Sequence, residues 1–214
     1  MATDLPLWWP LLLSLLLALL LLSFGSKHGP LPLTAERANV IAGVSVALLL
    51  LWQLKAAIHP LLALHFLGLT LLTLVAGARL ALLAGLLLAT VDSGWHSQWA
   101  LLPLNMLCLV CVPVLASRAA LFVVKALLPA HLFLYIFIAA FGGAAAAICL
   151  GYGSRALILL LGEQVGGRQL LEQNIQLLPL LTLPEALLNG MAVTLMAVYR
   201  PQWLATFNAR KILG

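Results

Sequence analysis

The sequence predicts an all-α, polytopic membrane protein, a helical bundle with about seven transmembrane helices. Of its 214 residues, 64% are hydrophobic and only 8% are charged, whereas soluble domains are about half apolar and about a quarter charged. The mean hydropathy is +1.14. Because one membrane-spanning helix takes roughly 20 residues, we expect a single integral membrane domain over residues 1–214, with no soluble domain beside it.

The first expected span covers about residues 7–24 and contains the apolar run Leu11–Leu22. A secretory signal peptide would begin with basic residues, but Asp4 is the only charge ahead of this run. We therefore expect an uncleaved helix, added in front of a six-helix core at about residues 38–199.

Six further apolar stretches predict the helices of this core, because each is bounded by charged and turn residues. The longest polar stretch, residues 151–175, contains the apolar patch Leu157–Leu161, for which we expect an interfacial helix. Gly43 and Ala47 lie one turn apart and favour close helix packing. The expected spans are 38–55, 60–77, 79–92, 99–117, 130–150 and 176–199.

The basic residues predict that the amino terminus lies outside and the carboxyl terminus inside. In this orientation Lys55, Arg155 and Arg168 lie outside and the other eight of the 11 Lys and Arg residues lie on the cytoplasmic side, as the positive-inside rule requires. Trp95 and Trp99 fall at span ends, where an interfacial aromatic belt belongs. Since the basic residues occur singly, they indicate topology and exclude a nucleic-acid surface.

Several polar side chains are expected at membrane depth, where they are costly and tend to line a pathway or a site. His65 lies about one to two turns into the third span. Glu185 lies in the outer to middle part of the seventh span, and Asn105 lies about two turns into the fifth. Asp92 and His96 belong to the outer connection between the fourth and fifth spans. We therefore expect one outward-facing cavity lined by His59, His65, Asp92, His96, Asn105 and Glu185.

Two interpretations of these residues remain open. Imidazole and carboxylate suit divalent first-row ions such as Co²⁺ or Ni²⁺, so His65 and its neighbours are candidate metal ligands. Alternatively, a membrane histidine hydrogen-bonds a neighbouring helix and fixes packing. Glu185 shares a helix face with Thr182 and Asn189, and it could serve a ligand, a proton or a structural hydrogen-bond network.

Catalytic and redox motifs are absent from the sequence in a usable context. It has no Walker A, nucleophile-elbow, H-E-x-x-H or G-x-G-x-x-G motif. Cys108 and Cys111 form a C-x-x-C in the middle of a span without a second pair, which is typical of small membrane-embedded residues and not of a zinc site. We therefore expect no enzyme and no ATPase. The sequence does not identify a cofactor, and a divalent transition-metal ion is a candidate as transported substrate.

The polar motifs resemble those of the CbiM/NikM family, the substrate-capture components of cobalt and nickel energy-coupling-factor transporters. The resemblance is stronger to the family's shorter bacterial branch, the energy-coupling-factor ABC transporter permeases. It covers the chain from about residue 60 to its end. The matching segments are His65-Phe-Leu-Gly-Leu-Thr-Leu-Leu, Pro103-Leu-Asn-Met106, Pro184-Glu-Ala-Leu-Leu-Asn-Gly190 and Tyr199-Arg-Pro-Gln-Trp203.

This resemblance implies a seven-helix bundle in which an added first helix packs on a six-helix core. It implies that His65 takes the position of a metal-ligating histidine and that Glu185 belongs to a polar cluster near the transport path. It also implies a bacterial inner (plasma) membrane and three kinds of contact: membrane lipid, a transmembrane coupling subunit and two cytoplasmic ATPases. Metal-binding members begin with Met-His, but Ala2 stands here in place of that histidine.

Two functions therefore follow from the sequence. The first is a substrate-capture subunit of an energy-coupling-factor transporter for a transition-metal ion such as cobalt or nickel. The alternative is a non-transport accessory or assembly subunit of a larger membrane complex, which kept the fold but lost the metal ligands. An intramembrane enzyme is not favoured, because no nucleophile and base stand at a readable spacing.

Overall fold

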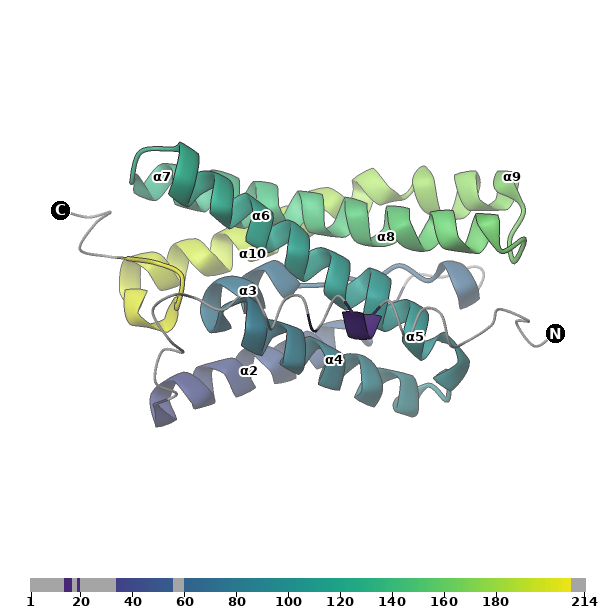
Figure 1. The fold of residues 1–214 in the computed structure, drawn as a ribbon, viewed down its shortest axis with the longest axis horizontal. Helices are drawn as coiled ribbons and strands as arrows, with labels where there is room; N and C mark the ends of the chain where they lie inside the picture. Colours follow the sequence, from purple (N-terminus) through teal and green to yellow (C-terminus); the bar gives the residue numbers. More distant parts are fainter. Residues whose placement is uncertain (1–13, 17–18, 20–33, 56–59, 209–214) are drawn as a thin grey trace.

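The computed structural model describes residues 14–16, 19, 34–55 and 60–208, and the regular structure in these ranges is entirely helical. Four helices in this part of the chain are long and apolar enough to cross a membrane: Ala78–Trp95, Trp99–Leu127, Leu132–Leu161 and Gly167–Tyr199. They lie side by side along the long axis of the molecule (Figure 1). The predicted fold class, an all-α membrane bundle, is confirmed.

Most of the expected first span, 7–24, lies outside the described residues, as do Ala2 and His59. Helix α2 (Ala35–Leu51) corresponds to the expected second span. It begins after Thr34, whose Oγ1 accepts a hydrogen bond from the N–H of Arg37 at 3.3 Å. A hydroxyl side chain in this position satisfies one of the free N–H groups of the first turn.

The expected third span, 60–77, is wrong as a continuous helix. A 3₁₀ turn, η1 (Pro60–Leu62), is followed by an irregular segment, and helix α3 (Leu69–Ala76) begins only after Gly68. The physical reason is the φ of +63° at Gly68, a left-handed conformation that a right-handed helix does not contain and that glycine adopts most readily. We call residues 63–68 the entry segment of α3.

Helix α4 (Ala78–Trp95) confirms the fourth expected span and extends it by one turn. The fifth helical stretch is longer than predicted and runs to residue 127, where the prediction ended at 117. It consists of η2 (Trp99–Leu101), α5 (Leu102–Asn105), the π-helical η3 (Met106–Cys111) and α6 (Val112–Leu127). The wide π turn precedes Pro113, whose missing N–H and bulky ring disturb the regular hydrogen bonding of the turn before it.

The sixth helical stretch also exceeds its prediction of 130–150. It comprises α7 (Leu132–Leu134), the π-helical η4 (Tyr135–Gly142) and α8 (Gly143–Leu161). The apolar patch Leu157–Leu161 is therefore the end of α8 and not a separate interfacial helix. Arg155, expected in an outer polar loop, lies within α8 and is 4% exposed. Its Nη1 donates to the carbonyl of Ala63 at 3.4 Å, which keeps the guanidinium inside the bundle.

The last helical stretch holds α9 (Gly167–Leu170), the π-helical η5 (Leu171–Ile175), α10 (Leu178–Tyr199) and η6 (Pro201–Trp203). Helix α10 confirms the expected seventh span and continues through Pro184. Residues after η6 fold back onto the end of α3, because the N–H of Ala205 donates to the carbonyl of Val75 at 3.1 Å.

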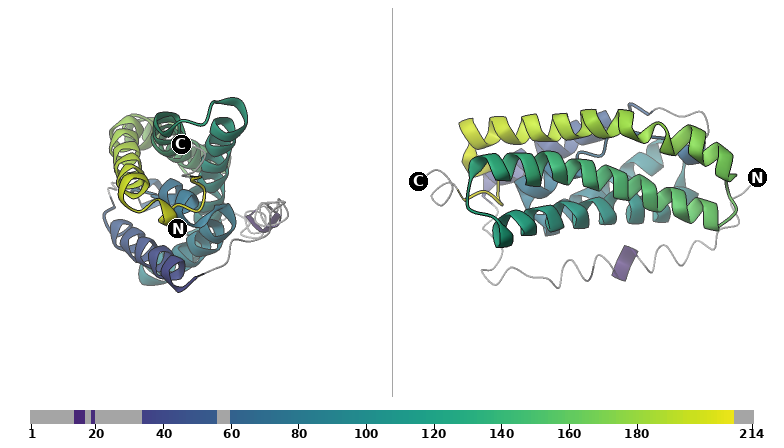
Figure 2. Two further views of the ribbon diagram at one scale, coloured as in Figure 1. Left: turned by 90° about the vertical axis from the view of Figure 1, so that its left-hand side faces the viewer. Right: turned by 90° about the horizontal axis from the view of Figure 1, so that it is seen from above.

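The helices form two groups around α3. Helices α6, α8 and α10 run side by side on one side, and α2 and α4 lie on the other (Figures 1 and 2). The turn at 95–99 and the loop at 161–167 lie at one end of the bundle, whereas the turn at 127–132 and the chain after 200 lie at the opposite end. Trp95 and Trp99 are exposed at the first end.

Small residues act differently on two helices. Gly43 and Ala47 of α2, expected in close helix packing, line a groove of about 580 Å³, and a Cβ on Gly43 would meet no atom of the described residues within 4 Å. Gly151 of α8 instead packs tightly on the π segment η3. A Cβ at this position would lie 2.8 Å from the carbonyl oxygen of Cys108, so α8 approaches η3 only because this side chain is absent.

We predict that Gly151→Ala destabilises the bundle by about 1–3 kcal/mol, because the added methyl group forces α8 away from a backbone carbonyl. Gly153→Ala is the matched control on the same helix, since a Cβ there would meet no atom of the described part of the chain within 4 Å. The control should be neutral or stabilising by about 0.5–1 kcal/mol. Thermal unfolding of the two variants in detergent checks this, and equal melting temperatures would contradict the packing.

Candidate functional site

The entry segment of α3 is held in the bundle by Tyr152 of α8. The backbone N–H of His65 donates to the Tyr152 hydroxyl at 2.8 Å, and the same hydroxyl donates to the carbonyl of His65 at 2.8 Å. Tyr152 is fully buried. One side chain therefore satisfies both backbone polar groups of a buried residue that no helix can satisfy.

The His65 ring has one nitrogen occupied. Its Nδ1 lies 2.8 Å from the carbonyl oxygen of Phe66, and because a carbonyl only accepts, Nδ1 is the donor in this contact. A neutral imidazole then carries its lone pair on Nε2, the form in which histidine binds metals. The ring of Trp52 lies beside His65 at a centroid distance of 5.2 Å, and its Nε1 donates to the carbonyl of Leu67 at 3.0 Å.

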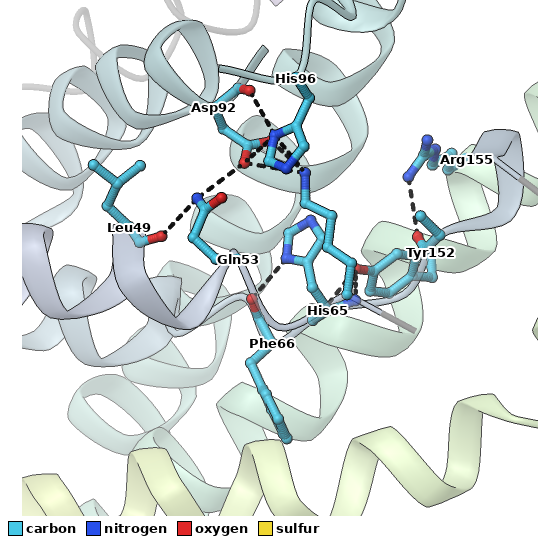
Figure 3. Close-up of polar contacts among 10 residues, drawn as sticks. Leu49, Gln53, His65, Phe66, Asp92, His96, Tyr152 and Arg155 are labelled. Atoms are coloured by element: carbon cyan, nitrogen blue, oxygen red, sulfur yellow. Dashed lines mark hydrogen bonds and ion pairs between the residues drawn. The ribbon is translucent and has the colours of Figure 1, made fainter. Parts of the chain in front are cut away.

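A charged cluster lies on the same side of the entry segment as the His65 ring (Figure 3). The Lys55 ammonium, four residues beyond the end of α2, lies 2.8 Å and 3.0 Å from the two carboxylate oxygens of Asp92. His96 is one turn further along α4, and its Nδ1 lies 3.4 Å from the Lys55 Nζ and 3.0 Å from the backbone carbonyl of Asp92. Gln53 contributes a weak contact to Asp92 at 3.5 Å.

The His65 imidazole lies within electrostatic reach of this cluster, since it interacts with the charges of Lys55, Asp92 and Arg155. Arg155 is buried and makes no ion pair among the described residues, and its Nε has no hydrogen-bond partner there. Two cations and one carboxylate therefore surround His65. The immediate electrostatic environment of the ring carries a positive excess.

Glu185 occupies a different position, on the α10 side of the entry segment. Its two carboxylate oxygens accept hydrogen bonds from the N–H of Leu67 at 3.0 Å and the N–H of Gly68 at 2.7 Å. Asn189, one turn further along α10, donates to the same carboxylate at 2.9 Å and accepts from the N–H of Leu71 at 2.8 Å. We call this set of contacts the Glu185 clamp.

The clamp takes the place of a helix cap. Gly68 is the N-cap residue of α3 and offers no side chain, so the free N–H groups at the start of the helix need acceptors from elsewhere. Glu185 and Asn189 supply them from α10. A carboxylate at the N-terminal end of a helix also interacts favourably with the positive end of the helix dipole.

The structure brings three of the five predicted ligand residues into one neighbourhood. His65, Asp92 and His96 lie on one side of the entry segment, as Figure 3 shows. Glu185 contacts none of them and shares no hydrogen-bond partner with His65. Asn105, at the end of α5, has a buried Oδ1 that accepts no hydrogen bond from the described residues. Within the described ranges, no group of three His, Cys, Asp or Glu side chains is arranged to hold a metal ion.

Sequence reasoning missed the residues that organise this site. Lys55 was interpreted only as a topology signal, and the sequence offers no cue that its side chain returns to α4. Tyr152 and Arg155 fall in the stretch 151–175, which the sequence predicts to be polar because of its glycines and charged residues. The helical spacing of small residues around them is a signal that α8 continues. Cys108 and Cys111 are buried and unpaired, as expected of packing residues.

Comparison with known proteins gives one finding across most of the chain. The family model described as "CbiM: Cobalt uptake substrate-specific transmembrane region" matches residues 4–203. No curated protein and no solved structure matches the chain significantly. The matched range includes the entry segment, the charged cluster and the Glu185 clamp.

We predict that Glu185→Gln destabilises the protein by about 1–3 kcal/mol, although glutamine has nearly the same shape. The amide offers one accepting oxygen, and its NH₂ group would face a backbone N–H of the entry segment, leaving a buried donor unpaired. Thermal unfolding in detergent measures the effect.

Glu172→Gln is the matched control for this substitution. Glu172 pairs with Arg168 at the surface, where the side chains are 52% and 90% exposed, and exposed pairs contribute about 0–1 kcal/mol. Its melting temperature should therefore stay close to that of the unaltered protein. Equal effects of the two substitutions would contradict the structural role of the clamp.

Proposed function

The chain belongs to the CbiM family of cobalt-uptake substrate-specific transmembrane regions, and from this premise we propose that it is the substrate-capture subunit of an energy-coupling-factor transporter. Membership makes it a transmembrane component of a cobalt-uptake family, and we propose that it acts as a transporter subunit and not as an enzyme. We propose that its cargo is a divalent transition-metal ion such as Co²⁺ or Ni²⁺. In this proposal the ion is a substrate that the bundle holds temporarily.

The observation that carries the proposal is the His65 ring. Its Nδ1 is engaged by the Phe66 carbonyl, which orients the ring and leaves Nε2 as the nitrogen that can bind a metal ion. Borderline transition-metal ions accept imidazole nitrogen readily. Trp52 packs against the His65 ring, and the Tyr152 hydroxyl holds the backbone of His65.

Asp92 and His96 are the proposed additional ligands, and Asn105 is a proposed oxygen donor. The carboxylate of Asp92 in the last turn of α4 and the imidazole of its C-cap residue His96 would complete, after rearrangement of these side chains, a mixed nitrogen and oxygen set suited to Co²⁺ or Ni²⁺. Glu185 is proposed to act indirectly, by holding the entry segment that carries His65. This assignment changes its role from a ligand to a positioning residue.

We further propose that the subunit works in a bacterial inner membrane with a transmembrane coupling subunit and two cytoplasmic ATPases. The chain has no nucleotide-binding motif, so the energy for reorienting the bundle would come from those partners. Single Lys and Arg residues at one end of the bundle support an orientation with the carboxyl terminus inside.

A second candidate function is favoured by one specific observation. The Asp92 carboxylate is already neutralised by Lys55, and no metal-binding group of three acidic, histidine or cysteine side chains exists among the residues that the structure describes. This arrangement also suits an accessory subunit that kept the fold without carrying metal. Co-purification with a stable complex lacking any ATPase, together with no metal in the preparation, would favour it.

His65→Ala should weaken Co²⁺ binding to the purified protein by about tenfold or more, because loss of a ligand costs at least as much as loss of a residue that supports one. Titration calorimetry in detergent measures this. His131→Asn is the control: this exposed residue lies at the opposite end of the bundle, where its side chain accepts from the N–H of Phe133, and asparagine preserves an acceptor. Equal affinity of the His65→Ala and unaltered proteins would remove the ligand role.

Tyr152→Phe should weaken Co²⁺ binding by about tenfold while leaving every proposed ligand in place. The substitution removes only the hydroxyl that bridges the N–H and carbonyl of His65. Calorimetry measures the effect on Co²⁺ affinity, and thermal unfolding measures the effect on the stability of the fold. A variant that unfolds at a lower temperature but binds Co²⁺ with unchanged affinity would show that this bridge stabilises the fold without positioning His65.

A further inference from the structure

Lys55 places a positive charge among the atoms that are proposed to bind the cargo. Its Nζ contacts both oxygens of Asp92, at 2.8 Å and 3.0 Å, and lies 3.4 Å from the Nδ1 of His96. The two carboxylate oxygens carry lone pairs that a metal ion could use. Because the His96 Nδ1 donates to the backbone carbonyl of Asp92 at 3.0 Å, the nitrogen of His96 that could bind a metal ion is Nε2. The Asp92 side chain is 7% exposed and that of Lys55 16%, so the pair is largely withdrawn from solvent.

The ammonium group and a divalent cation cannot share these donors. Two like charges a few ångströms apart repel strongly in a medium of low dielectric constant. Each lone pair of the carboxylate used by Lys55 is also unavailable to the metal. Binding of a divalent ion at Asp92 and His96 therefore requires that the Lys55 Nζ leaves first.

The attachment of Lys55 to the backbone permits this movement. Helix α2 ends at Leu51, and among the described residues the N–H of Lys55 makes one tight-turn hydrogen bond, to the carbonyl of Gln53 at 3.1 Å. Its side chain has four rotatable methylene groups and is 16% exposed. Rotation about these bonds can carry the ammonium into solvent without unfolding a helix.

We propose that Lys55 is an internal counter-cation that occupies the Asp92–His96 site in the absence of cargo and must be displaced before a divalent transition-metal ion binds there. This inference rests on the proposed function for the identity of the cation. The Lys55 ammonium then competes with the metal ion for Asp92 and His96. The apparent affinity for metal is lowered by the fraction of time that Lys55 fills the site.

Arg155 explains why the displaced charge does not remain nearby. Its buried guanidinium has no ion-pair partner among the described residues and already makes the surroundings of His65 positive. A divalent ion would raise this positive charge further. Of the two protein cations, the Arg155 guanidinium is buried within α8, whereas the Lys55 side chain is flexible and partly exposed. The Lys55 ammonium is therefore the cation that we expect to move when a divalent ion binds.

The test is Lys55→Met in the full-length protein, since methionine has a similar length and no charge. We expect Co²⁺ to bind about tenfold more tightly than to the unaltered protein, because the competitor is gone. Adding Asp92→Asn to this variant should reverse the gain. Lys125→Met, on the remote end of α6, is the matched control and should leave the affinity unchanged.

A second measurement uses the unaltered protein and does not depend on the variant's folding. A small amine-reactive reagent should modify Lys55 faster when Co²⁺ is bound, because the ammonium then lies in solvent. Mass spectrometry of the Lys55 peptide, with Lys125 as the internal reference, quantifies this. Unchanged modification of Lys55 at saturating Co²⁺, or unchanged affinity of Lys55→Met, would overturn the inference.

The outcomes separate this inference from the proposed function. If His65→Ala abolishes Co²⁺ binding but Lys55→Met has no effect, the proposed function stands and the inference fails. If the unaltered protein binds no Co²⁺ but Lys55→Met does, in a manner that requires Asp92, the inference stands and the transport role fails.

Discussion

The Glu185 clamp is the interaction on which the rest of the site depends. Residues 63–68 run through the interior of a membrane bundle without helical hydrogen bonds, a situation that is tolerated only when other groups satisfy the backbone. Glu185 and Asn189 on α10 accept from the N–H groups of Leu67, Gly68 and Leu71. The Tyr152 hydroxyl on α8 accepts from the N–H of His65 and donates to its carbonyl. Because both sides of the segment are fixed, the His65 ring has one position relative to Trp52 and α4.

Charge arrangement then determines what this position can do. A lone buried histidine is a common structural feature, but here it lies near one carboxylate and two cations. The single carboxylate, Asp92, is balanced by Lys55, which keeps a costly buried charge paired when no cargo is present. The Lys55–Asp92 ion pair stabilises the bundle when no cargo is bound. This ion pair must break before a metal ion can bind at Asp92. Capture and release of a divalent ion both become exchanges of one cation for another.

The sequence predicted the fold class correctly because hydropathy alone decides it. It also selected His65, Asp92, His96 and Glu185 as unusual polar residues at depth. It could not predict that 60–77 is broken at Gly68, since a left-handed glycine looks like any other glycine inside an apolar run. It could not predict that Glu185 accepts hydrogen bonds from the backbone of the entry segment and does not contact His65, because the partners of a side chain depend on how α10 and α3 cross. The role of Lys55 was hidden for the same reason: a residue at a span end has no sequence signature that its side chain folds back on a neighbouring helix.

We propose that the clamped entry segment holds His65 so that its Nε2 can bind a transition-metal ion. X-ray absorption spectroscopy of the full-length protein loaded with Co²⁺ tests it most directly, because imidazole ligands give a characteristic scattering pattern. We expect an imidazole contribution that decreases in His65→Ala, while an oxygen contribution from carboxylate remains. A bound Co²⁺ surrounded by oxygen alone, or an imidazole signal that is identical in His65→Ala, would contradict it.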